Sequence, residues 1–223
     1  MYLVPLVLFA FAGGRFYYLA PAYPMLMAAG AVLGEGWLGR LAHARALLCG
    51  RLTWAALAAG AVFGGALMLP IAPVNSAWWK ATSKVHDNFA EEIGWPELVE
   101  KLAEIHAAWP EDERQKLGIL AGNYGEAGAV NLYGPAYGLP EAISGINSYW
   151  LRGFGRRPPE VLIVVGFSRR EAERIFAECE AAGRITNRYG VENEETRFHP
   201  DVFVCRGLRE PWPEFWRRHR RFG

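Results

Sequence analysis

Residues 13–24 read GGRFYYLAPAYP, and they lead directly into a long apolar run. Arg15 supplies a permanent positive charge, and two prolines interrupt regular helical hydrogen bonding at the same point. The amphipathic rings that suit the headgroup level of a bilayer are those of Tyr17, Tyr18 and Tyr23. The stretch therefore predicts the mouth of a membrane helix, and its residues fit either a lipid-phosphate site or an ordinary interfacial anchor.

Two apolar runs are long enough to cross a bilayer. The first has 23 residues with Glu35 as its only charge, and the second, which starts at residue 52, has 18 with none. Because a hydrocarbon core requires about 20 helical residues, we expect spans over 16–38 and 52–70. Residues 1–12 are apolar but cover only about half a span, which predicts the end of an upstream membrane helix and a longer parent chain. The transmembrane segment is expected over 1–72.

The link between the two predicted spans is basic. Residues 39–51 contain three arginines and no acidic residue, and positive charge in a short loop is typical of the cytoplasmic side of a membrane. We therefore expect a multi-pass protein of the cell (inner) membrane, with everything after the second span outside the cytoplasm. Residues 73–93 predict a polar connector in which Trp78 and Trp79 lie at headgroup depth.

Residues 94–223 alternate apolar runs with charged segments, as in a water-soluble domain. The continuous Val and Ile run at 160–166 predicts a strand that is buried on both faces. Ser168 and Glu171 have the spacing of a capping box, which predicts a helix over 169–182. Other strands are expected over 116–122, 140–145, 184–189 and 201–206, and other helices over 95–109, 123–137 and 212–221. The alternation predicts an extracytoplasmic α/β sandwich domain with a largely parallel sheet.

The chain has three cysteines, Cys49, Cys179 and Cys205, and they form no Cys-x-x-Cys pair. No histidine lies near them at a metal-ligand spacing, so no metal site is expected. Cys179 falls on the apolar face of the predicted helix 169–182, and Cys205 falls within a predicted strand. Buried free thiols are the expected state, and a disulfide between these two cysteines is the alternative outside the cytoplasm.

Polar and aromatic residues follow two of the predicted strands. Asn123, Tyr124 and Glu126 come after the first strand in a glycine-rich turn, and Asn147 comes after the second. Open α/β sheets usually bind ligands at the edge where parallel strands end, and sugars are commonly held by such side chains. These residues are therefore candidates for substrate binding. The alternative is a structural turn and a polar rim that packs onto the membrane domain.

The segment from Arg15 to Pro24 resembles the late membrane segment of bacterial glycosyltransferases. The family is the dolichyl-phosphate-mannose protein mannosyltransferase (GT-C) superfamily, which includes the aminoarabinose transferases acting on lipid A. In these proteins a Lys or Arg followed by Tyr-Leu-x-Pro-x-x-Pro opens a span on the outer side of the membrane. The segments NYGEAGA (123–129) and SGINSYW (144–150) look like C-terminal domains attached to many members.

The resemblance implies transfer of a sugar from a polyprenyl-phosphate carrier to an acceptor on the outer face of the membrane. Arg15 would pair with the carrier phosphate, and Tyr17 or Tyr18 would line its cavity. The family's catalytic acid lies in the first outer loop, before this chain begins, so these residues alone are expected to be inactive. The implied partners are the polyprenyl-phosphate-linked sugar, membrane lipid and the remaining N-terminal transmembrane bundle. No cofactor and no nucleic acid is expected, and the need for a divalent cation is open.

A non-catalytic module is the rival hypothesis. In this alternative the outer domain recognises a glycan or a protein, and the membrane spans only tether it.

Overall fold

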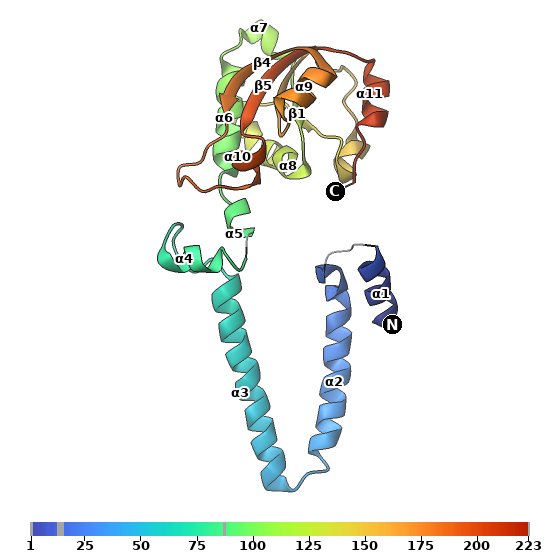
Figure 1. The fold of residues 1–223 in the computed structure, drawn as a ribbon, viewed down its shortest axis with the longest axis vertical. Coiled ribbons are helices and arrows are strands. Elements are labelled where there is room, and N and C mark those ends of the chain that lie inside the picture. Colours follow the sequence, from blue (N-terminus) through green and yellow to red (C-terminus); the bar gives the residue numbers. More distant parts are fainter. Residues whose placement is uncertain (1, 13–15, 87, 223) are drawn as a thin grey trace. The chain divides into compact units, whose positions relative to one another are not determined.

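The computed structural model describes residues 2–12, 16–86 and 88–222 of the chain. The chain forms two compact units, Met1–Leu69 and Pro70–Gly223 (Figure 1). The boundary lies close to the end of the expected transmembrane segment, and the expected connector belongs to the second unit.

The first unit consists of helices joined by short segments. Its elements are α1 (Leu3–Phe11), the 3-10 helix η1 (Phe16–Ala22), α2 (Tyr23–Leu38) and α3 (His43–Met68). None of the described side chains of α2 and α3 is buried, and many of their large apolar side chains are exposed. An apolar surface of this extent requires lipid or protein neighbours.

Among the described residues, α3 alone is long and apolar enough to cross a membrane. Its 26 residues extend about 39 Å, against a hydrocarbon core of about 30 Å. It starts at His43, earlier than expected. The expected span over 16–38 is divided, because Pro21 lies inside η1 and α2 begins only at Tyr23 with Pro24 in its first turn. Proline has no N–H to donate, so α2 is left with 16 residues, or about 24 Å.

In the described part of the second unit, five strands form one mixed sheet in the order β2-β1-β3-β5-β4. The strands are β1 (Leu117–Ala121), β2 (Ala142–Ile143), β3 (Val161–Val165), β4 (Phe176–Arg184) and β5 (Asp201–Leu208). β1 pairs in parallel with β2 and β3, whereas β5 is antiparallel to β3 and β4. The expected α/β domain is therefore present, but its sheet is parallel only at the β2-β1-β3 end.

Helices cover both faces of this sheet (Figure 1). They are α6 (Trp95–Ala107), α8 (Tyr124–Tyr133), α9 (Arg169–Ile175) and α11 (Trp212–Arg218), with short α4 (Ala77–Thr82), α5 (Asn88–Glu91), α7 (Glu111–Arg114) and α10 (Glu194–Phe198) and the 3-10 helices η2 (Gly134–Tyr137) and η3 (Asn147–Arg152). Alternate residues of β1, β3 and β5 enter two cores. Leu98 and Leu102 of α6 and Val130 of α8 pack in the α6–α8 core, while Phe215 and Trp216 of α11 pack in the α9–α11 core.

The predicted helix over 169–182 is wrong in its second half. Its start is confirmed, since Ser168 and Glu171 make a capping box. The helix ends at Ile175, and β4 begins at the next residue and runs along β5 at the edge of the sheet. The helical spacing of Ala172, Ile175 and Phe176 extends to Cys179 by coincidence. Most of β4 is exposed, so its residues carry little strand pattern.

Cys179 and Cys205 lie directly opposite each other on β4 and β5, with their Cα atoms 4.2 Å apart, and they form a disulfide. The expectation of free thiols is therefore wrong for this pair, and the alternative disulfide is present. Cys49 carries a free thiol. The two errors have one cause. The predicted helix over 169–182 contained Cys179, and only when this residue lies in a strand does it face Cys205 across the sheet.

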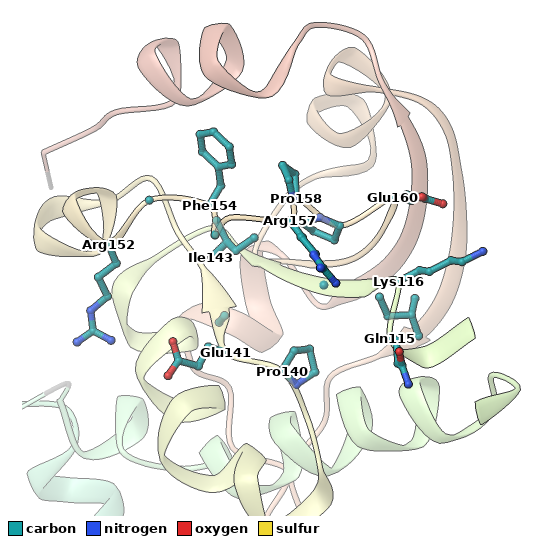
Figure 2. Close-up of a pocket in the computed structure, with 16 residues that line it drawn as sticks. Gln115, Lys116, Pro140, Glu141, Ile143, Arg152, Phe154, Arg157, Pro158 and Glu160 are labelled. Carbon is teal, nitrogen blue, oxygen red and sulfur yellow. The ribbon is translucent and has the colours of Figure 1, made fainter. Parts of the chain in front are cut away.

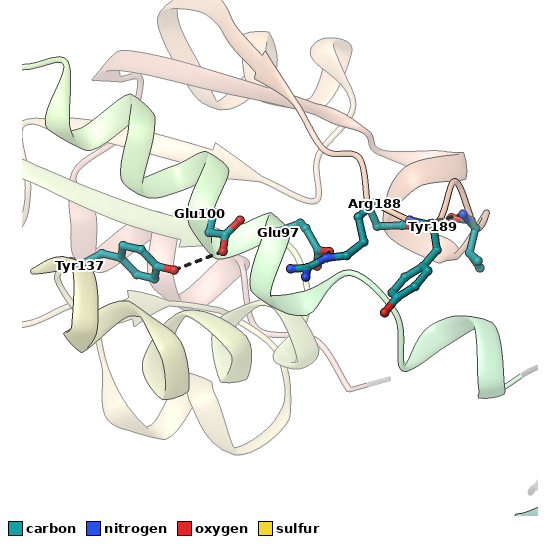
Figure 3. A network of polar contacts seen from close by, with 7 residues as sticks. Glu97, Glu100, Tyr137, Arg188 and Tyr189 are labelled. Atoms are coloured by element: carbon teal, nitrogen blue, oxygen red, sulfur yellow. Dashed lines mark hydrogen bonds and ion pairs between the residues drawn. The ribbon is translucent and has the colours of Figure 1, made fainter. Parts of the chain in front are cut away.

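The predicted strand over 184–189 is wrong except at Arg184, which ends β4; residues 185–189 form a loop whose side chains contact α6. The Arg188 guanidinium contacts the Glu97 carboxylate at 2.5 Å, and the Tyr137 hydroxyl donates to Glu100 at 3.4 Å (Figure 3). The same loop holds the connector, because the side chain of Asn75 donates to the Tyr189 carbonyl. α6 is thus fixed on one side by this loop and on the other by η2.

Candidate functional site

The ends of β1 and β3 form the switch point of the parallel part of the sheet. The chain leaves β1 at Gly122 and enters α8, which packs in the α6–α8 core. It leaves β3 at Gly166 and enters α9, whose Ala172 packs in the α9–α11 core on the other face. Ligands of open α/β sheets usually bind between two such diverging connections. The predicted residues Asn123, Tyr124 and Glu126 follow β1 at this point.

The backbones of the two strand ends approach each other too closely to leave an open crevice. A Cβ atom on Gly122 would lie 2.2 Å from the Gly166 carbonyl oxygen. Gly166 has a φ of +76°, and a Cβ atom on it would lie 2.1 Å from the Glu126 carboxylate. Glycine is needed at both positions because no side chain fits. The Glu126 carboxyl group therefore occupies the position at which a ligand would be expected.

Glu126 is only 1% exposed, and its Oε2 accepts hydrogen bonds from the backbone N–H groups of Gly122 and Asn123, at 2.9 and 3.2 Å. The Asn123 side chain in turn accepts from the Glu126 N–H at 2.8 Å, which completes a capping box for α8. Burial raises the pKa of Glu126 to about 8, although both N–H donors favour the carboxylate. The group is therefore mainly protonated at neutral pH.

A second buried carboxyl group lies on α10. Glu195 is 5% exposed, and burial followed by the negative charges of Glu91 and Glu194 raises its pKa. Within the described chain, Glu195 Oε2 and His199 Nδ1 are buried without a hydrogen-bond partner. The negative charge of Glu195 also contributes to the raised pKa of Glu126. Both carboxyl groups are buried, so neither presents its oxygens at the surface to a substrate.

The other two predicted residues of the domain, Tyr124 and Asn147, are not part of this cap. Asn147 opens η3 with a φ of +52°, and its N–H donates to the Arg221 carbonyl at 2.9 Å. Tyr124 is 56% exposed and points its polar group to no described partner. The structure thus brings Asn123 and Glu126 together in a helix cap, in which the side chains of Tyr124 and Asn147 take no part. Of the four, Tyr124 is the one whose side chain is free to meet a ligand.

The predicted membrane mouth is described only in part. Arg15 and the side chain of Tyr17 lie outside the described residues. Tyr18 is 46% exposed, with its ring centroid 5.5 Å from that of Phe9 in an edge-to-face arrangement, and the Tyr23 ring lies 6.3 Å from the Tyr2 ring. Aromatic contacts therefore hold η1 and the start of α2 against α1.

An open cleft of about 480 Å³ lies at the opposite edge, where the three parallel strands begin (Figure 2). The segments before β1, β2 and β3 form its walls, and the loop over 153–159 contributes Phe154 and two prolines. Its charged side chains are Lys116, Glu141, Arg152, Arg157 and Glu160. We call this region the amino-edge cleft. Sequence reasoning missed it because its residues come from three separate segments that each resemble an ordinary solvated loop.

The positively charged side chains of the amino-edge cleft have few polar partners among the described residues. Neither Lys116 nor Arg157 makes a side-chain hydrogen bond or ion pair with any residue that the structure describes. Figure 2 shows the Arg157 side chain extending into the cleft between Pro140 and Lys116. The Arg152 guanidinium lies 4.6 Å from the centroid of the Tyr149 ring, which leaves its N–H donors available. Free guanidinium and ammonium groups beside apolar walls are suited to an anionic ligand with a ring or chain.

Among residues 2–12, 16–86 and 88–222, no group of three His, Cys, Asp or Glu side chains is placed to hold a metal ion. Comparison with protein-family models, curated proteins and solved structures finds no match. The functional interpretation therefore depends on the residues of this chain.

Proposed function

We propose that the chain is the C-terminal portion of a polytopic membrane glycosyltransferase, which transfers a sugar from a polyprenyl-phosphate carrier to an acceptor on the outer face of the membrane. In this proposal α3 and the η1–α2 segment enter the membrane, and the α/β domain lies outside the cytoplasm. Arg15 and the neighbouring tyrosines meet the carrier phosphate. The catalytic acid belongs to an upstream part of the protein.

The disulfide between β4 and β5 is the observation that carries this proposal. Structural disulfides persist in oxidising compartments and are rare in the cytoplasm. Cys179 and Cys205 therefore support an extracytoplasmic domain independently of the positive charges at Arg40, Arg45 and Arg51. A domain outside the cytoplasm, attached to apolar helices, is where an enzyme with a lipid-linked sugar donor would meet its acceptor.

The orientation can be tested by thiol labelling in intact cells, in a Cys49→Ser background. Leu151→Cys places a thiol on the α/β domain at a side chain that is 74% exposed, and Ala42→Cys places one in the turn between α2 and α3. A membrane-impermeant maleimide should label Leu151→Cys in intact cells and Ala42→Cys only after lysis. The reverse pattern would refute the proposed location.

The donor site can be tested in the full-length protein with a radiolabelled polyprenyl-phosphate sugar. Loss of a charge-assisted contact between Arg15 and phosphate costs about 1.5–3 kcal/mol, so Arg15→Ala should reduce transfer roughly 10- to 100-fold. Arg15→Lys should retain more activity than Arg15→Ala. Arg45→Ala, on the predicted cytoplasmic side, is the matched control and should be unaffected. Unchanged donor use by Arg15→Ala would show that the phosphate role is wrong.

The amino-edge cleft is the proposed place where the domain selects an anionic acceptor. Replacement of Lys116 or Arg157 by Gln should raise the KM for the acceptor by roughly tenfold and leave the KM for the donor unchanged. Arg156→Gln is the control, because Arg156 is exposed beside the cleft but does not line it. Equal effects of the three substitutions would remove the cleft from the proposal.

A non-catalytic, membrane-anchored binding module remains the second candidate. The observation in its favour is that Asn123 and Glu126, the polar residues at the usual ligand edge, are used as a helix cap. In that case the cleft would bind a glycan or protein in a chain without transfer activity. Binding that is lost in Arg157→Gln, together with no transfer by any full-length form, would favour the module.

A further inference from the structure

The connector between α3 and the α/β domain is an amphipathic element with two distinct faces. Trp79 and Thr82 of α4 are 8% and 3% exposed, whereas Trp78 and Val85 are 47% and 64% exposed. The turn after α4 continues the helical hydrogen bonding, since the N–H of His86 donates to the Thr82 carbonyl. Residues 78 and 85 are seven apart, or about two helical turns, so their side chains share one outward face.

The inward face anchors α4 to the domain. Trp79 packs with Phe89 and Val191 in a separate hydrophobic cluster. Expected at headgroup depth, Trp79 is instead a core residue, and only Trp78 of the pair is available to lipid. A hydrogen bond adds to this attachment just before α4, from the Asn75 side chain to the Tyr189 carbonyl at 2.8 Å. α4 is therefore a fixed part of the domain and not a flexible tether.

Positive charge lies beside this face, on the rest of the exposed side of α4. Lys80 and Lys84 are exposed, and residues 70–86 contain no Asp or Glu. Neither lysine forms an ion pair with a described residue. Trp is favoured at the boundary between headgroups and hydrocarbon, and lysines are attracted to anionic lipid. This chemistry matches a lipid surface better than a protein groove, which would need a continuous apolar patch.

Chain length keeps this face near the end of α3. Trp78 lies ten positions after Met68, the last residue of α3, and a fully extended chain of that length reaches about 35 Å. Pro73 and Ser76 shorten the path, because the Ser76 N–H donates to the Pro73 carbonyl. If α3 crosses the membrane, Trp78 is thus restricted to the neighbourhood of the surface from which α3 emerges.

We infer that the exposed side of α4, where Lys80 and Lys84 lie beside the face of Trp78 and Val85, docks on anionic lipid headgroups and holds the α/β domain at the membrane surface. The inference rests on membrane insertion of α3, which is part of the proposed function, and it does not depend on sugar transfer. The domain would then be presented to its acceptor in a restricted orientation.

Nitroxide depth measurements on the full chain test this inference. The variants Trp78→Cys and Val85→Cys, in a Cys49→Ser background, are spin-labelled and reconstituted into vesicles of phosphatidylcholine with and without phosphatidylglycerol. Leu151→Cys is the exposed control on the domain, and Ala61→Cys, within α3, reports insertion. Collision ratios of oxygen to a water-soluble nickel complex at positions 78 and 85 should be several-fold higher than at position 151. Phosphatidylglycerol should increase the difference.

Two results would overturn the inference. Labels at positions 78 and 85 that are as water-accessible as the label at 151 would show that the face meets water or another protein. A Lys80→Glu/Lys84→Glu double substitution that leaves the depth in anionic vesicles unchanged would exclude the headgroup interaction. A label at position 61 outside the hydrocarbon would overturn the inference together with membrane insertion, whereas a failed transfer assay with correct depths would count only against the transferase.

Discussion

Glu126→Gln should change how the stability of the α/β domain depends on pH. The carboxyl group has a pKa of about 8 in the folded protein, against 4.5 as the ordinary value, because burial disfavours its charged form. Between these values the unfolded chain loses this proton while the folded chain keeps it. Glu126 therefore contributes stability that is fully present below about pH 4.5 and is lost as the pH rises through about 8.

The structure sets the size of the effect. One proton taken up on folding changes the free energy of unfolding by about 1.4 kcal/mol per pH unit, so the loss across the whole interval has a ceiling of about 5 kcal/mol. Gln has the shape of Glu and is also accepted at this position of a capping box, so it retains an oxygen for the N–H groups of Gly122 and Asn123. The variant should therefore fold and lose the downward slope.

Urea unfolding of the full chain in detergent micelles, followed by tryptophan fluorescence at several pH values between 5 and about 8, measures this slope. The wild type should become less stable with rising pH, and Glu126→Gln should be flatter and more stable than the wild type at the alkaline end. Glu160→Gln, at an exposed carboxyl group, should parallel the wild type. Parallel curves for wild type and Glu126→Gln would refute the reasoning, because the carboxyl group would then be ionised throughout.

Three further predictions test the packing of the domain. Gly166→Ala should lower the free energy of unfolding by more than about 2 kcal/mol, since residue 166 has a φ of +76° and an added Cβ atom has no space. Gly138→Ala is the control in the same unfolding assay. Its φ of +69° is similar but the space around it is open, so it should cost only about 1 kcal/mol. Replacing both Cys179 and Cys205 by Ser should cost about 3.5 kcal/mol from the entropy of a loop with a sequence separation of 26, and thermal unfolding with and without reductant checks this. Burial lowers the pKa of His219 to about 4, so its contribution to the free energy of unfolding is present above pH 6.5 and is lost as the pH falls towards 4. His219→Phe should remove this loss of stability at acid pH, which the same unfolding assay measures.

Much of the domain could be predicted from local patterns. The apolar run of β3, the helical spacing of α6 and the capping box at Ser168 each report structure within a few residues, and each is confirmed. β4 could not be predicted in this way, because its stability comes from pairing with β5 and from the bond between Cys179 and Cys205. Those partners lie 17 to 32 residues away in sequence, and no local pattern reports them.

The two candidate sites of the domain differ for the same reason. Asn123 and Glu126 have a capping-box spacing similar to that of Ser168 and Glu171, and the sequence left a structural turn and a sugar site open as alternatives. Whether such a Glu faces solvent or the interior depends on how closely two strand ends approach, and the closeness here comes from glycines at 122 and 166, more than forty residues apart. The amino-edge cleft likewise exists only after β1, β2 and β3 are aligned. Since the carboxyl edge is closed by Glu126, selection of an anionic acceptor, if the domain performs it, is expected at the edge where the strands begin.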